Sequence, residues 1–247
     1  MAPTDDRAPK FKDERQTSRR FYKAVAVAEV AGGFGVTLDA RTLRTPSGAV
    51  FLAPTRALAE ACAAEWNAQG ERIVPATMPV TQLAFAAIDW ARPAREARVD
   101  FIASYGQTDL CCHRAETPKE LAERQAASWQ PLVSWVEATL GVSLPVVNTI
   151  VAADVSPATL AALRARALTL DDFRLTALSQ ATALAGSVII GFALLDGRLD
   201  AAQAYEVSTL DDQWSLERWG EDGEARARLL RVREEFEGLG AFLQALA

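Results

Sequence analysis

The pattern of hydrophobic and polar positions divides the chain into a short alternating part and a long helical part. From Phe21 to Leu52, apolar and polar residues alternate in short runs separated by turn residues such as Gly32-Gly33, a pattern typical of antiparallel strands and hairpins. From Pro79 onward, apolar residues recur every three or four positions, as in amphipathic helices. We therefore predict an α+β fold: a small N-terminal antiparallel β domain with one helix, followed by a larger, mainly α-helical domain.

The boundaries follow from where the pattern changes. We predict a mobile tail over residues 1–17, a β-rich N-terminal domain over 18–78 and a helical C-terminal domain over 79–247. The helix of the first domain is predicted to begin at Pro54-Thr55 and to end at Gly70. The predicted strands are Tyr22–Val30, Phe34–Leu38, Leu43–Thr45 and Ala49–Leu52, with two further extended segments near 109–114 and 145–151. The predicted helices of the second domain are 80–91, 94–106, 118–140, 157–168, 171–185, 187–196, 200–219 and 222–244.

Composition and charge narrow the class of protein. Half of the 247 residues are hydrophobic, mean hydropathy is +0.02 and the net charge is −6, which suits a globular protein and argues against nucleic-acid binding. Three cysteines and a polar N-terminus without an apolar signal segment predict a cytoplasmic bacterial protein. The apolar run Ala181–Leu195 is shorter than the roughly 20 residues of a membrane span. It predicts a buried central helix and no membrane insertion.

The candidates for catalytic chemistry are few. Cys111-Cys112-His113 could supply a thiolate nucleophile, so a thiol-dependent enzyme is one alternative. Adjacent residues of an extended segment point to opposite faces, however, so we favour the interpretation that the cysteines are small apolar side chains of a partly buried strand. Gly32-Gly33-Phe34-Gly35 lacks the lysine and the helix of a phosphate loop. With a single histidine in the chain, we predict no catalytic residue, no metal and no cofactor.

An acidic residue interrupts one apolar helical stripe. On the predicted helix 200–219, Asp211 falls inside the stripe, whereas Asp212 projects off it towards solvent. A carboxylate on an apolar face costs several kcal/mol unless it is paired. Asp211 is therefore either paired internally, for example with an arginine, or part of a binding surface. The candidate partner-binding residues are Asp211, Asp212, Val207, Trp214, Arg218 and Glu221.

The last predicted helix carries an apolar seam that allows a second alternative. Its residues recur at spacings of three and four, which predicts packing on the body of the protein. A helical scaffold that binds another partner through this seam is the competing interpretation. The seam residues are Leu229, Val232, Phe236, Leu239, Leu243 and Leu246.

A series of motifs resembles the assembly chaperone family that attends the α subunit of the ATP synthase catalytic head. The most specific pair is Glu65-Trp66-Asn67-Ala68-Gln69 followed by Met78-Pro79-Val80-Thr81-Gln82-Leu83-Ala84, which is similar to the family's E-W-x-x-Q and M-P-x-T-x-L-A motifs. The order and spacing of the motifs carry the resemblance from about Arg20 to the last helix. The other matching segments are Arg20–Lys23, Leu38–Pro46 (with Ala40 where glycine is commoner), Ile88-Asp89, Tyr105, Thr108–Leu110, Gln125, Trp129–Leu132, Gly186-Ser187 and Trp219-Gly220.

The resemblance implies a non-enzymatic chaperone. It implies that the chain, a monomer, binds the unassembled α subunit, prevents its aggregation and releases it to the β subunit, in the bacterial cytoplasm or, for eukaryotic relatives, the mitochondrial matrix. It also implies that Asp211 is the main functional candidate, at a position where most of the family carries glutamate. The residues expected to maintain the fold are Glu65, Trp66, Gln69, Met78, Pro79, Trp219 and Gly220.

Overall fold

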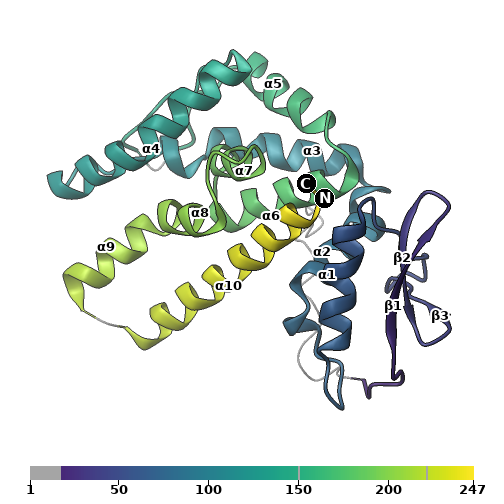
Figure 1. The fold of residues 1–247 in the computed structure, drawn as a ribbon. Helices are drawn as coiled ribbons and strands as arrows, with labels where there is room; N and C mark the ends of the chain where they lie inside the picture. The colour runs from purple at the N-terminus through teal and green to yellow at the C-terminus, as the bar shows by residue number, and fades with distance from the viewer. Residues whose placement is uncertain (1–17, 150, 221) are drawn as a thin grey trace, which may run out of the picture.

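A computed structural model describes residues 18–149, 151–220 and 222–247. It shows a small sheet at one end of a mostly helical body (Figure 1). This arrangement confirms the predicted α+β class. Residues 1–17 and Glu221, which include the predicted tail and one candidate site residue, lie outside the described residues.

The sheet consists of three antiparallel strands in the order β1-β2-β3. β1 (Val25–Val30) and β2 (Gly33–Leu38) form a hairpin across the two residues Ala31 and Gly32, and β3 (Arg41–Thr42) pairs with β2. Gly32 has φ +89°, a left-handed conformation that glycine adopts without strain. The expected hairpin over 43–52 forms as well, with Arg44 opposite Val50.

Helix α1 (Arg56–Asn67) covers one face of this sheet. Thr55 begins it, since its side chain accepts a hydrogen bond from the Leu58 backbone. The prediction that the helix runs on to Gly70 was wrong. The Gln69 amide donates to the Glu65 carbonyl at 3.0 Å, so a side chain caps the last turn and the left-handed glycine is not needed.

The helices of the second part match the predicted segments closely. The exception is the predicted helix 200–219, which breaks at Thr209. The Tyr205 carbonyl accepts both the Thr209 backbone N–H at 3.0 Å and the Thr209 hydroxyl at 2.7 Å, so the threonine side chain closes the last turn of α8. The helices are α2 (Pro79–Ala86, continued by a π-helical turn over Ala87–Ala91), α3 (Arg95–Ser104), α4 (Lys119–Leu140), α5 (Pro157–Leu168), α6 (Asp172–Ala185), α7 (Val188–Leu195), α8 (Ala201–Ser208), α9 (Leu210–Trp219) and α10 (Gly223–Ala245).

The two short extended segments are only partly as predicted. Leu110–Cys112 forms a 3-10 turn, because the Asp109 carboxylate accepts the Cys111 backbone N–H and folds the chain back. His113 then pairs with Val147 in a single parallel bridge. The 3-10 turns Pro75–Thr77 and Tyr105–Gln107 complete the connections.

Side chains from both parts of the chain share one continuous hydrophobic core. Phe51 and Leu58 of the first part and Phe236 and Phe242 of α10 belong to the same buried cluster. The division into two domains at residues 78 and 79 stays a prediction. Helix α7 is buried at every position from Val188 to Leu194, as expected of a central helix. In the part of the chain that the structure describes, no helix is long and apolar enough to cross a membrane.

Candidate functional site

Helix α9, which carries the candidate acid, lies at the outer end of an arm that α8, α9 and α10 form (Figure 1). Within α9, all of which is described, Leu210 alone is buried. A helix with so little apolar burial is held mainly by its polar contacts. These contacts reach α4 on one side and α10 on the other.

Asp211 is paired internally, with an amide rather than an arginine. The Gln125 side chain of α4 donates to Asp211 Oδ1 at 2.7 Å. Gln125 is itself buried, and its Oε1 accepts the Ala115 backbone N–H at 2.7 Å, which fixes the orientation of the amide. Among the described residues, Oδ2 of Asp211 receives no hydrogen bond. The acid is thus oriented through one oxygen, while the other is left for a further donor.

The environment of Asp211 opposes its ionisation. Partial burial raises the pKa of the Asp211 carboxyl, the neighbouring Asp212 adds to the rise, and the hydrogen bond from Gln125 reduces it. A carboxylate that is only partly solvated gains more from a cationic partner than a fully hydrated one does. The site therefore favours a basic side chain of a binding partner.

Two exposed ion pairs flank the acid. Asp212, predicted to be solvated, accepts a hydrogen bond from Arg228 of α10. Arg124 of α4 binds both oxygens of Glu217, at 2.6 and 3.1 Å. Exposed pairs of this kind contribute little to the stability of a fold, because water and salt screen the charges. Helix α9 is therefore held near its start by the pair with α10 and near its end by the pair with α4, and both pairs are weak.

Aromatic side chains accompany the acid on α9. The rings of Trp214 and Trp219 lie 5.8 Å apart in an edge-to-face arrangement, and Trp219 is 64% exposed. Trp219 was expected to maintain the fold, but the structure places it on the surface. Arg218 is also exposed. Val207 of α8 is half-buried, and its carbonyl accepts the indole N–H of buried Trp129 at 2.9 Å. Large exposed aromatic rings are typical anchors of protein interfaces.

The E-W-x-x-Q residues join α1 to α2. The Glu65 carboxylate accepts the backbone N–H groups of Val80 and Thr81, at 2.9 and 2.7 Å, and so caps the start of α2. Trp66 is buried against Tyr22, whose hydroxyl donates to the Trp66 carbonyl at 2.7 Å. These contacts are internal, and neither side chain faces a binding surface.

The M-P residues place the start of α2 against the last helix. Met78 is buried, and Pro79 occupies the first position of α2, where its missing N–H costs nothing. A Cβ atom on Gly238 of α10 would lie 2.6 Å from Pro79 Cβ. Gly238 is therefore what allows the two helices to approach so closely. Gly220 has a different role: it ends α9 with φ +93°, a backbone conformation that favours glycine.

The cysteine and histidine side chains do not form a catalytic pair. Burial raises the pKa of the Cys112 thiol to about 12 and that of the Cys111 thiol well above its usual range. The His113 ring is held by two backbone carbonyls, with Nδ1 3.1 Å from Asp109 O and Nε2 3.2 Å from Val151 O. Thiols in this state are poor nucleophiles. Among the described residues no cluster of three or more His, Cys, Asp or Glu could hold a metal ion.

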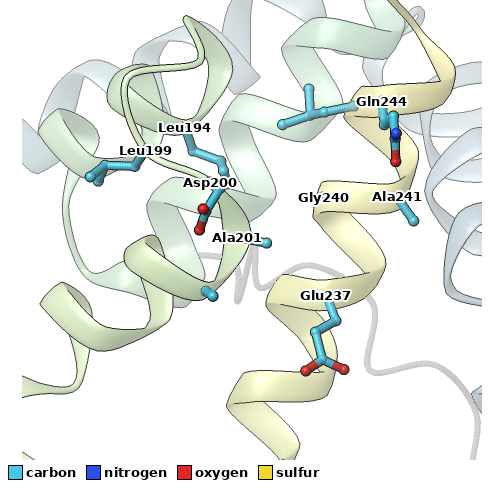
Figure 2. A pocket seen from close by; sticks show the side chains of 10 residues that line it. Leu194, Leu199, Asp200, Ala201, Glu237, Gly240, Ala241 and Gln244 are labelled. Atoms are coloured by element: carbon cyan, nitrogen blue, oxygen red, sulfur yellow. The ribbon is translucent and has the colours of Figure 1, made fainter.

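A groove of about 510 Å³ lies between the start of α8 and the last turns of α10 (Figure 2). Its walls carry leucine and alanine side chains, with the carboxylates of Asp200 and Glu237 at the edge (Figure 2). Asp200 is engaged as the cap of α8, where it accepts the Gln203 N–H at 2.8 Å. The groove offers no nucleophile or base arranged for catalysis. The lining residues are Leu194, Leu199, Asp200, Ala201, Ala202, Glu237, Gly240, Ala241, Leu243 and Gln244.

Comparisons with known proteins identify the family. The family model for the ATP12 chaperone protein matches residues 19–137. A crystal structure of Atp12 from Paracoccus denitrificans is 38% identical and covers 93% of this chain, with 98% of its own length matched and a TM-score of 0.87. The chain belongs to the ATP12 chaperone family. This result confirms the family of ATP synthase assembly chaperones that the motifs indicated.

Further relatives agree with this assignment to the ATP12 family. A structure of a point mutant of Paracoccus denitrificans Atp12p has a TM-score of 0.88 and 36% identity, covering 95% of this chain and 100% of that one. The mitochondrial protein atp12 of Schizosaccharomyces pombe is 28% identical over 214 residues, which are 82% of this chain and 74% of that protein. The ATP12 fold is therefore shared along most of the chain.

Proposed function

We propose that this ATP12 family chaperone binds the unassembled α subunit of the ATP synthase catalytic head. In this proposal it keeps the α subunit from aggregating and releases it when the β subunit takes its place. Support comes from the family and from the nature of the exposed surface: a chaperone face must combine apolar anchors with charges that permit release. The surface of α9 has this combination.

One observation carries the assignment of the site: a partly buried carboxylate is oriented by a buried amide, on a helix that also carries the half-buried ring of Trp214 and the exposed ring of Trp219. Asp211 is fixed by Gln125, and Trp214 and Trp219 lie on the same short helix. Among the described residues, no cation is paired with Asp211, and its Oδ2 is available to a donor from outside the chain. We infer that Asp211 receives a basic side chain of the client, with the tryptophan rings packing on apolar residues around it.

The test is co-purification with the α subunit of the same organism. Asp211→Asn preserves an acceptor for Gln125 but removes the charge, and Asp211→Lys reverses it. We expect about tenfold weaker α binding for the asparagine variant, as for the loss of one charge-assisted contact, and no soluble complex for the lysine variant. Asp154→Lys, the same charge reversal at an exposed position in the loop before α5, lies on neither α9 nor the sheet; it is the matched control and should bind normally.

Thermal unfolding of each variant separates function from folding. If Asp211→Asn unfolds at the same temperature as the wild type and still binds α normally, the proposed site is wrong. If α fails to bind even the wild type, the proposed client is wrong.

Two alternatives are disfavoured by the structure. A thiol-dependent enzyme needs an accessible thiolate, and Cys111 and Cys112 are buried with raised pKa values. A scaffold that binds through the seam of the last helix needs that seam exposed. Its residues instead pack inside the protein, where α10 contacts α1, α2, α6 and α8.

A further inference from the structure

The two outer edges of the β1–β2 hairpin differ in what covers them. Along β2, the following chain completes the pairing: Phe34 and Ala53 exchange two backbone hydrogen bonds of 2.9 Å, and the Leu43 N–H donates to Val36 O at 2.8 Å. Along β1, no segment of the described chain pairs with the outer side of Val25–Val30. Within the described residues, the sheet therefore has one closed edge and one open edge.

The pairing register tells which backbone groups the open edge presents. The Asp39 N–H donates to Ala24 O, so this pair is hydrogen-bonded, and alternate residues of β1 point towards β2 in the same way. The intervening residues Val25, Val27 and Glu29 therefore direct their N–H and C=O groups outward. Together they offer three donors and three acceptors in the spacing of a strand.

The open edge lacks the features that usually protect such edges. Proteins commonly block them with proline, lysine or a bulge. β1 has none of these, and its one charged residue, Glu29, lies beside Arg56 at 3.8 Å. On the outer face of β1, Ala26 and Ala28 are small, and the larger Val30, 46% exposed, lies at the turn end of the strand. From Val25 to Ala28, a strand can therefore approach without meeting a charged or large exposed side chain of β1.

We infer that this edge binds an extended segment of the non-native α subunit, which adds to the sheet as a fourth strand. The inference rests on the proposed function, and it deepens that proposal by naming a second contact and its chemistry. Unpaired backbone groups are complementary to another backbone and select an extended conformation rather than a side-chain sequence. This kind of recognition suits a client that is not yet folded.

A second copy of this chain is a less suitable occupant. The strand has six residues, and pairing over six residues buries much less than the roughly 1,200 Å² of a stable interface. A contact of this size is useful only together with another contact to the same partner. The client, which we propose to bind at α9, supplies such a combination.

Backbone hydrogen exchange on the wild-type protein tests the inference directly. The free protein should exchange the amides of Val25, Val27 and Glu29 quickly, and the complex with α should exchange them at least about tenfold more slowly. The amides of Ala26 and Ala28 form the ladder with β2, so they should be protected in both states. They are the internal control within the same strand.

A proline substitution provides an independent readout. In Val27→Pro the lost N–H is one that points outward, a position where edge strands tolerate proline. We expect α binding to weaken about three- to tenfold, as for the loss of one or two hydrogen bonds. Val27→Ala keeps the N–H and removes more of the side chain, so it should bind α normally.

The outcomes separate this inference from the proposed function. If α binds while the three outward amides keep exchanging quickly, the edge does not bind the client. The proposal that the α subunit is the client is unaffected by that result. Protection that is already present in the free protein means that another copy or residues 1–17 cover the edge, and it overturns the inference. If α does not bind at all, the proposed client and this inference fail together.

Discussion

At the scale of single residues, side chains that close the ends of helices explain much of this structure. Glu65 caps α2 through two backbone N–H groups, Asp109 receives the Ile189 N–H at the start of α7, and Gln69 closes the last turn of α1. The Glu65 and Asp109 contacts join segments that are not adjacent in the chain, whereas the Gln69 contact is local to the end of α1. They give the polar residues of the family motifs a structural role rather than a catalytic one.

Removing the Glu65 cap should destabilise the protein. Glu65→Ala leaves two backbone donors at the start of α2 unsatisfied, and we expect the free energy of unfolding to fall by about 1–2 kcal/mol. Glu60→Ala on the same helix removes only an exposed pair with Arg56 at 3.9 Å, so it should change the stability by less than about 0.5 kcal/mol. Urea unfolding of both variants checks the difference, and equal losses would contradict this role of Glu65.

Asp109 should make the stability depend on pH. Burial raises the pKa of its carboxyl from 3.8 to about 6, against hydrogen bonds from Ser187, Ile189 and Cys111. Because the folded pKa lies above the unfolded one, this contribution is fully present below about pH 4. It is lost as the pH rises through about 6.

The Asp109→Asn variant isolates this effect. Between pH 4 and 7 the wild type should lose up to about 3 kcal/mol of stability relative to the variant, since each unit of pKa corresponds to about 1.4 kcal/mol. Denaturant titrations of both proteins across this range measure the difference. A constant difference between the two proteins would show that Asp109 has the same pKa folded and unfolded.

At the scale of elements, the close contact between α2 and α10 depends on a missing side chain. Gly238→Ala would bring a Cβ atom to 2.6 Å from the rigid Pro79 ring. We expect this substitution to cost about 1–3 kcal/mol through overpacking. Gly223→Ala, also on α10, has no neighbour within 4 Å and should leave stability unchanged or slightly raised. Thermal unfolding distinguishes the two variants, and an unaffected Gly238→Ala protein would mean that the helices can separate at little cost.

The elements themselves could be predicted largely from the sequence. Apolar periodicity located the helices, and the turn residues located the hairpins, because these signals are local. The break at Thr209 was missed, since it depends on whether the threonine hydroxyl donates to the Tyr205 carbonyl one turn earlier. The partner of Asp211 was missed for a different reason. Gln125 is 86 residues away, and only the packing of α9 on α4 brings the two together.

The solvent exposure of individual side chains was also harder to predict than the location of the helices and strands along the chain. The stripe on the 200–219 segment correctly indicated that Asp211 is partly buried, but nothing local distinguishes exposed Trp219 from buried Trp129. The open edge of β1 could not be predicted either, because it depends on which strands pair. The candidate site is thus visible in the sequence as a list of residues, while its geometry follows from the fold.

At the scale of the whole molecule, the proposed client contacts lie at opposite ends. The α9 arm lies at one end of the helical body and the sheet at the other, with a shared core between them (Figure 1). Two weak contacts at a distance can hold a large client while each remains easy to release. This arrangement fits a chaperone that must give its client to another subunit.

The most direct measurement is the aggregation of purified α subunit during refolding, followed by light scattering. One equivalent of this chain should suppress the scattering and form a complex with α, and addition of β should free the chain as α and β associate. The Asp211→Lys protein, if it is as fully folded as the wild type, should suppress little of the scattering. Scattering that is unchanged by the wild-type chain would contradict the central claim that this ATP12 family protein is a chaperone of the α subunit.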